Sequence, residues 1–155
     1  MARMPDGKLY IYRGDGYGSV DVSKRVEVRM PTGAPDTAAL TQILAAGDIT
    51  GDKRPEVFAT AGDALWVFTG YTGGAFGSAI RLSGSAWTAR DVVAVGDYNK
   101  DGAADLVYRS FTSGRLLLRH GKPHAETVTD LPSIGSAAAS LKGVDAAPAG
   151  PAPTS

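Results

Sequence analysis

Two stretches of the sequence place oxygen-bearing side chains at alternate positions. In the later stretch, Asp97, Asn99, Asp101 and Asp105 stand at positions one, three, five and nine. Calcium takes about six to eight oxygen ligands at about 2.3 to 2.6 Å, so a tight loop with alternate side chains turned inward can wrap it. A backbone carbonyl fills one site, and Ala103 is the expected donor. We predict that this loop binds Ca²⁺ and orders on binding, because the cation turns repulsion between carboxylates into attraction.

An earlier stretch carries the same pattern with different side chains. It offers Asp48, Thr50, Asp52 and Glu56 at the same four positions, with Arg54 in the place of the carbonyl donor. Each of these residues can supply an oxygen to a hard cation through a carboxylate, a hydroxyl or a backbone carbonyl. The sequence therefore predicts two calcium sites.

Two differences between the stretches predict unequal affinities. Position six is Gly102 in the later stretch and Lys53 in the earlier one, and lysine resists the positive φ that glycine accepts easily. Position nine is Asp105 in the later stretch, whereas Glu56 is one methylene longer. We therefore expect the Asp97 loop to bind calcium more tightly than the Asp48 loop, whose site is distorted or weaker.

A simpler interpretation is that both stretches are turns, because aspartate and glycine are common between strands. The matched registers argue against it, since an apolar strand follows each stretch, at Val57–Ala59 and at Leu106–Tyr108. An EF-hand would need flanking helices and a glutamate at the end of a loop of about 12 residues, and neither stretch has these. We favour metal sites of another kind over simple turns.

Both stretches belong to a longer internal repeat, which indicates the elements that must position them. The run Ala45–Val57 recurs 49 residues later as Ala94–Leu106. A short apolar strand that ends in a glycine turn occurs three times, at Leu9–Gly14, Leu65–Gly70 and Leu116–Gly121. A period of about 50 residues that holds four short strands matches the blade of a β-propeller. We expect about three blades of four antiparallel strands in this chain, two of them complete and the rest partial.

Short β-rich runs separated by glycine, proline and aspartate dominate the chain, and almost no stretch has the spacing of an amphipathic helix. We therefore predict an all-β fold. Residues 1–135 are expected to form the propeller segment, and residues 136–155 a degenerate repeat remnant, in which Asp145 starts a loop without the other acids, and an Ala/Pro-rich tail. The expected strands are Leu9–Tyr12, Arg25–Arg29, Ile43–Ala46, Val57–Thr60, Leu65–Thr69, Ile80–Leu82, Val92–Val95, Leu106–Arg109 and Arg115–Arg119.

The composition excludes several classes of function. The 16 basic and 16 acidic residues cancel, so no overall field attracts nucleic acid or an anionic membrane surface. The chain has no cysteine, which excludes disulfides, thiolate chemistry and cysteine-bound metals. It also has no apolar run of the length of a membrane span or a signal peptide. We expect no nucleic-acid partner and no membrane span.

The repeats resemble FG-GAP or VCBS repeats, the units of integrin-α-type propellers. The run Gly47–Glu56 is similar to the actinobacterial, and so bacterial, version of this repeat, and Phe76-Gly77 stands where the family has its Phe-Gly element. The resemblance covers about residues 8–125. It implies blades with calcium in a strand-connecting loop, a binding or scaffolding role, and an extracellular, secreted protein.

We therefore expect a non-catalytic, calcium-stabilised propeller module that binds a protein or carbohydrate. The chain offers no Ser-His-Asp set and no open catalytic metal centre, so we do not expect an enzyme. The alternative is an accessory propeller part of a secreted hydrolase or lyase whose catalytic residues lie outside this chain.

Three other features could contribute to binding. Trp87 follows Ser83-Gly84-Ser85 and is predicted near a surface, where its ring could stack on a sugar or anchor a partner. The tripeptide Arg13-Gly14-Asp15 could be displayed in a hairpin turn, although turns favour these residues in any case. His120 and His124 have no suitably spaced acid pair beside them and are predicted to be ordinary surface histidines.

Three blades are too few to close a ring, because propellers have about four to eight. An open ring exposes sheet edges, which proteins usually cover. We therefore expect the chain to complete a ring by self-association or by pairing with another propeller fragment.

Overall fold

The computed structural model describes residues 1–83 and 86–121. These residues form antiparallel β-strands and one short 3₁₀ helix, η1 (Thr37–Ala39), which confirms the predicted all-β class. β1 was not predicted, and β3 starts and ends earlier than the expected Arg25–Arg29. The strands are β1 (Ala2–Arg3), β2 (Leu9–Gly14), β3 (Val20–Glu27), β4 (Leu40–Gly47), β5 (Glu56–Ala61), β6 (Ala64–Thr69), β7 (Ser78–Ser83), β8 (Arg90–Gly96), β9 (Asp105–Ser110) and β10 (Leu116–Arg119).

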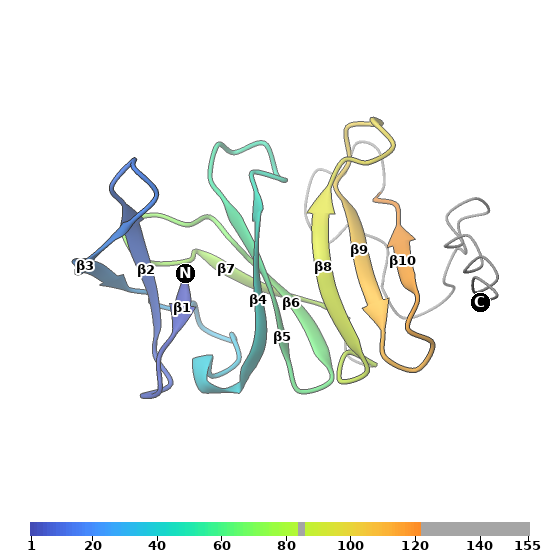
Figure 1. Ribbon diagram of the computed structural model, residues 1–155, viewed down its shortest axis with the longest axis horizontal. Helices are drawn as coiled ribbons and strands as arrows, with labels where there is room; N and C mark the ends of the chain where they lie inside the picture. Colours follow the sequence, from blue (N-terminus) through green and yellow to red (C-terminus); the bar gives the residue numbers. More distant parts are fainter. Residues whose placement is uncertain (84–85, 122–155) are drawn as a thin grey trace, which may run out of the picture.

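The described strands form three antiparallel sheets, each made of consecutive strands: β1-β2-β3, β4-β5-β6-β7 and β8-β9-β10. We call them the first, middle and third sheets. Figure 1 shows them side by side in one row, with the four-stranded sheet in the middle. This blade-like arrangement agrees with the predicted propeller class, although the described part of the chain does not form a closed ring.

Within the described residues, one sheet rather than two has all four strands. The first sheet has no counterpart of β4 there, and the third sheet has no counterpart of β7. A fourth strand of the third sheet would follow Gly121, and the predicted remnant with its Asp145 loop lies further on. Both fall outside the described residues.

A tight turn joins the two central strands of the middle sheet. Ala61 pairs with Ala64, which leaves Gly62 and Asp63 as a two-residue turn. Gly62 has φ 55°, a value that such hairpin turns require and that glycine adopts without strain. The Asp63 carboxylate accepts a hydrogen bond from the backbone N–H of Thr88 at 3.1 Å. The turn therefore also fastens the middle sheet to the segment that enters the third sheet.

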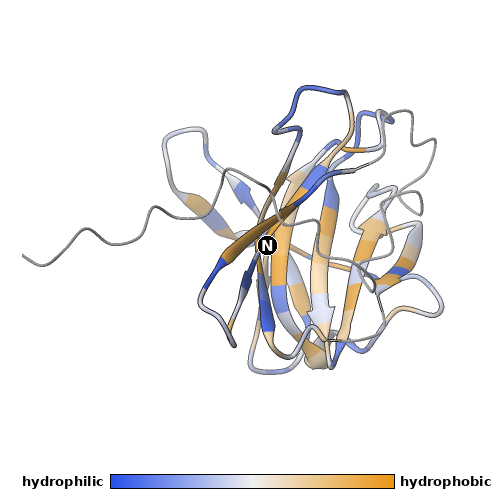
Figure 2. Cartoon of the chain, turned by 90° about the vertical axis from the view of Figure 1, so that its right-hand side faces the viewer, coloured by the Kyte–Doolittle hydropathy of each residue, from blue (hydrophilic) through white to orange (hydrophobic). Residues whose placement is uncertain are grey.

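The middle sheet is buried on both faces, because successive residues of a strand point to opposite sides. Phe58 packs toward the third sheet, while Val57 and Ala59 pack toward the first sheet. In Figure 2, orange apolar stretches follow the packed strands and several connecting loops are blue. The buried residues between the middle and third sheets are Phe58, Leu65, Val67, Trp87, Val92, Leu106 and Tyr108. Those between the first and middle sheets are Leu9, Val28, Leu40, Val57, Ala59, Phe68 and Phe76.

Trp87 is not near a surface, contrary to the sequence-based prediction. It is 2% exposed, and its ring centroid lies 5.7 Å from that of Tyr108. The chain crosses here from the middle to the third sheet, and the indole fills the space between them. The predicted ligand-binding role of Trp87 is therefore wrong, because a buried ring cannot stack on a ligand.

The two acidic stretches occupy equivalent places in neighbouring sheets. The first loop (Asp48–Glu56) joins β4 to β5, and the second loop (Asp97–Asp105) joins β8 to β9. Figure 1 shows both loops at the top, at the same end of the strands. β4 and β8 also contact each other: the Gln42 side-chain Oε1 accepts a hydrogen bond from the Val92 backbone N–H at 3.0 Å. The repeat in the sequence is thus a repeat in space.

Candidate metal centre

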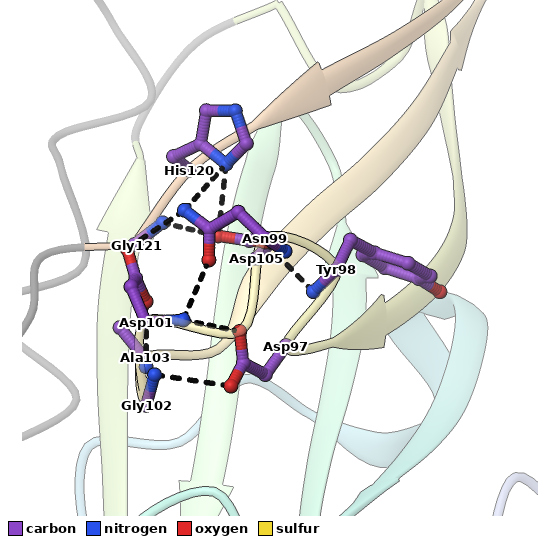
Figure 3. Close-up of polar contacts among 9 residues, drawn as sticks. All are labelled: Asp97, Tyr98, Asn99, Asp101, Gly102, Ala103, Asp105, His120 and Gly121. Atoms are coloured by element: carbon purple, nitrogen blue, oxygen red, sulfur yellow. Dashed lines mark hydrogen bonds and ion pairs between the residues drawn. The ribbon is translucent and has the colours of Figure 1, made fainter.

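The second loop folds around its own acidic side chains (Figure 3). The Asp97 carboxylate accepts hydrogen bonds from the backbone N–H groups of Asp101 at 3.1 Å and Gly102 at 3.0 Å. The Asp101 carboxylate accepts one from the Ala103 N–H at 2.9 Å and one from the Asn99 side-chain amide at 2.7 Å. The Ala103 N–H and then the Asn99 amide hold the pKa of Asp101 below its ordinary value. Asp101 therefore stays ionised, as a cation ligand must.

Asp105 fastens the second loop to two strands. It is fully buried, and its Oδ2 accepts hydrogen bonds from the N–H groups of Tyr98 at 2.9 Å and Asn99 at 3.3 Å. Its Oδ1 accepts one from the Gly121 N–H at 2.9 Å, just after β10. The carboxylate therefore connects the beginning of the loop with the third strand of the sheet.

His120 lies at this loop, which the sequence reasoning missed. Its Nδ1 is 3.3 Å from Asp105 Oδ1 and 3.2 Å from Asn99 Nδ2. The His120 side chain is 37% exposed, in agreement with the predicted surface position, but it also contacts the second loop. His124 falls outside the described residues. The repeat could have predicted this contact, because it places the strand before His120 next to the strand that begins at Asp105. The pairing of β9 with β10 sets Arg119 opposite Leu106 and so brings His120 and Gly121 next to Asp105.

The first loop repeats the hydrogen-bond pattern of the second. Its Asp48 carboxylate accepts from the N–H groups of Gly51 at 2.7 Å and Lys53 at 2.9 Å. Asp52 accepts from the Arg54 N–H at 2.8 Å. Glu56 Oε2 accepts from the N–H groups of Ile49 at 2.8 Å and Thr50 at 3.3 Å. The two loops therefore share one backbone design despite the extra methylene of Glu56.

Each loop needs positive φ at two positions, and each fills them with one glycine and one lysine. At position four the first loop has Gly51 (φ 80°) and the second has Lys100 (φ 63°). At position six the order is reversed, with Lys53 (φ 64°) and Gly102 (φ 86°). Lys53 thus adopts the conformation that the sequence analysis expected it to resist. It does not distort the backbone of the first loop.

Glu56 differs from Asp105 in the hydrogen bonding of its second carboxyl oxygen. Glu56 is 0% exposed, and its Oε1 has no hydrogen-bond partner among the described residues. Desolvation raises the pKa of this carboxyl above its ordinary value, and the nearby charges of Asp52 and Asp48 act in the same direction. The first loop therefore contains a buried carboxyl oxygen without a hydrogen-bond donor among the described residues, and burying such an oxygen is unfavourable.

The residues of both loops fit a calcium ion by type. In residues 1–83 and 86–121, no three His, Cys, Asp or Glu side chains are grouped closely enough to form a metal site by themselves. The carboxylates face their own backbone N–H groups, but each carboxylate oxygen has a further lone pair to offer. Hydroxyl, amide and carbonyl oxygens complete the hard-oxygen set that Ca²⁺ prefers. The orphaned oxygen of Glu56 is the structural observation that supports this fit.

The exposed aromatic side chain near these loops is Tyr98, at position two of the second loop. It is 51% exposed, and Ile49 at the same position of the first loop is half-buried against the core. Tyr98 thus has the exposure that a ring needs to contact a partner and that Trp87 lacks.

The matched loops and the blade-like sheets agree with a comparison against protein-family models. That comparison matches residues 48–108 to the FG-GAP-like repeat. This chain therefore contains an FG-GAP-like repeat. The match begins at the first residue of the first loop, covers β5, β6 and β7, includes the whole second loop and ends in β9. Neither the search of curated proteins nor the search of solved structures gave a significant match.

The Phe-Gly element of this repeat, Phe76-Gly77, has a structural role. Phe76 is buried, with its ring centroid 5.7 Å from that of Phe68 and 5.3 Å from that of Tyr71. The Gly77 N–H donates a hydrogen bond to the Thr69 carbonyl at 3.0 Å. The element closes the connection between β6 and β7. In the described ranges, no helix has the length and apolarity needed to cross a membrane.

Proposed function

We propose that this chain is a non-catalytic propeller-type module, stabilised by calcium, that binds a protein or carbohydrate partner outside the cell. The observation that carries the calcium part is Glu56 Oε1, a buried oxygen without a partner in the described residues. A carboxylate in that position is costly unless it is neutralised or paired. A cation held by the first loop would remove this cost.

The ligand sets follow from the shared positions of the two loops. In the first loop they are Asp48, Thr50, Asp52, Glu56 and the carbonyl of Arg54, and in the second loop they are Asp97, Asn99, Asp101, Asp105 and the carbonyl of Ala103. Bound calcium would neutralise the carboxylates that converge in each loop. The loops connect paired strands, so their ordering would strengthen the sheets.

The two sites are proposed to differ in affinity, with the second binding more tightly. The expected difference at position six no longer supports this ranking, because each loop holds one lysine at positive φ. The difference at position nine remains, since Asp105 is a shorter carboxylate with both oxygens hydrogen-bonded. Asp105 is therefore better fixed than Glu56.

The binding role is proposed from the repeat family and from the exposed ring of Tyr98. Exposed aromatic rings supply large contact area to proteins and sugars. Tyr98 is therefore proposed for the partner-binding role that was predicted for Trp87.

Thermal unfolding with calcium and with a chelator tests the calcium part. A ligand that binds only the native state stabilises it by about 2.7 kcal/mol at about 100 times its Kd. We expect a clear calcium-dependent rise in Tm for the wild type. Asp97→Ala/Asp101→Ala should lose the larger share of this rise, and Asp48→Ala/Asp52→Ala the smaller share.

The matched control is Asp15→Ala/Asp21→Ala, which removes the exposed Asp15 and the half-buried Asp21 of the β2–β3 hairpin. This variant should keep the full calcium-dependent rise even if its Tm without calcium falls. A wild-type Tm that does not change with calcium would contradict the proposal that calcium stabilises the module. Hydrolase or lyase activity of this chain alone would contradict the proposal that the module is non-catalytic.

A further inference from the structure

The third sheet has a face that no other described sheet covers, and on it exposed apolar side chains lie beside Arg109, which pairs with Asp91. Leu116 is 56% exposed and Phe111, just after β9, is 52% exposed. Val107 pairs with Leu118 across β9 and β10, so both lie on one face, and Leu116 lies on that face two residues earlier. Val107 and Leu118 are half-buried. We call the face marked by Val107, Leu116 and Leu118 the outer face of the third sheet.

The same positions of the middle sheet are buried against the third sheet. Phe58 pairs with Val67 as Val107 pairs with Leu118, and Leu65 stands where Leu116 stands. Phe58, Leu65 and Val67 all belong to the buried cluster between the middle and third sheets. The outer face therefore repeats one half of an interface that the chain already forms internally.

The first sheet carries the other half of this interface on its free side. Leu9 and Ile11 pack toward the middle sheet, so the alternating residues Tyr10 and Tyr12 point to the opposite face. No other described sheet packs there, but the Arg25 guanidinium of β3 lies 4.7 Å from the centre of the Tyr10 ring, and Tyr10 is 9% exposed. Tyr10 stands at the position of Trp66 in the middle sheet, and Trp66 packs across the interface with the first sheet. The outer face of the third sheet and the free face of the first sheet thus correspond to the two faces that meet at each interface between neighbouring sheets of the chain.

We infer that the outer face of the third sheet binds the free face of the first sheet of a second copy, head to tail, so that two copies form a ring. Each copy contributes three described sheets, and two copies give six, which lies within the range of about four to eight blades for closed propellers. Head-to-tail contacts of this kind form closed rings when the rotation between copies closes. The net charge of zero means that two copies do not repel each other as a whole.

The first measurement is the mass of the full chain in solution by sedimentation and light scattering over a wide range of concentration. We expect a species with twice the mass of one chain. Leu116→Lys and Tyr12→Glu should each raise the dissociation constant of the dimer about 100-fold or more, because each places an unpaired charge in both contacts of the ring. Tyr17→Lys is the control, since Tyr17 is 96% exposed at the tip of the β2–β3 hairpin. This variant should remain a dimer.

Mixing the two charged variants tests the head-to-tail arrangement. In a mixed ring, the introduced lysine faces the introduced glutamate at one contact, and the other contact is wild-type. The mixture should therefore form dimers although each variant alone does not. Circular dichroism checks that each variant retains its strands.

Three results would overturn the inference. A wild type that stays monomeric at every concentration would show that no second copy covers the outer face, for example because residues 122–155 of the same chain cover it. A larger assembly would exclude the ring of six. A Tyr12→Glu variant that dimerises as well as the wild type would show that the copies associate through another pair of faces.

Discussion

At the scale of single residues, the two acidic loops show how one backbone tolerates different side chains. Each loop holds two residues at positive φ, and the glycine and the lysine exchange places between the loops. The left-handed conformation costs a non-glycine residue about 1 to 2 kcal/mol. The side-chain carboxylates of Asp48 and Asp97 hold these positions by accepting hydrogen bonds from the backbone at position six. In the first loop, the hydrogen bond from the Lys53 N–H to Asp48 therefore offsets part of the strain at this lysine.

Lys53→Gly should raise the free energy of unfolding by about 0.5 to 1 kcal/mol, because it removes the left-handed strain at a modest cost in chain entropy. Urea titration measures the change. Lys53→Ala is the control and should give no such gain, since alanine keeps a Cβ at φ 64°. Equal stability of the two variants would contradict the strain argument.

The buried carboxyl of Glu56 should make stability depend on pH when calcium is removed. Its pKa is raised in the folded state, so the folded protein binds more protons than the unfolded chain at pH values between the two pKa values. In chelator, the free energy of unfolding should therefore fall as pH rises from about 4.5 through the folded pKa, and stay low above it.

Glu56→Gln should lose this pH-dependent fall, because glutamine is neutral throughout. Unfolding by urea at a series of pH values measures it. The exposed Glu27→Gln variant is the control and should keep the wild-type profile. A wild-type profile in Glu56→Gln would show that another group causes the pH dependence.

At the scale of elements, β5 is the strand with the most complete burial. All residues from Glu56 to Thr60 are buried, because β5 lies inside the middle sheet and that sheet has neighbours on both faces. The apolar run Val57–Ala59 at its centre is typical of a strand covered on both sides. The first loop ends in this strand, so the candidate metal ligand Glu56 is fixed by the best-packed element of the fold.

Phe58→Ala should lower the free energy of unfolding by about 3 to 5 kcal/mol, since it leaves a cavity between the middle and third sheets. Chemical denaturation measures the loss. Tyr17→Ala at the exposed hairpin tip is the matched control and should change stability by less than about 0.5 kcal/mol. A loss of less than about 1 kcal/mol in Phe58→Ala would mean that the two sheets do not depend on this contact.

At the scale of the whole molecule, the described fold is a row of three sheets joined by two interfaces. The two interfaces use corresponding strand positions such as Leu65 and Leu9, and each end sheet has one face that packs against no other described sheet. The acidic loops lie at one end of the strands, whereas the proposed contact between copies uses the faces of the end sheets. Calcium binding and ring formation are therefore separate properties with separate tests.

Local sequence patterns were enough to predict the all-β class, the repeat and the two matched loops. These features are local: alternation within strands, glycine at turns, and acids at fixed spacing depend on neighbouring residues. The approximate strand positions followed for the same reason, as for Val57–Thr60 inside β5 and Leu106–Arg109 inside β9.

The tertiary structure alone decided which side chains the fold buries and which it brings together. Trp87 is covered because the middle and third sheets meet over it, and His120 reaches Asp105 because β10 pairs with β9. Glu56 is shielded from solvent because β5 has a sheet on either side, and its Oε1 has no hydrogen-bond partner among the described residues. Each of these outcomes depends on contacts between distant parts of the chain, and local spacing in the sequence carries no information on which faces will meet.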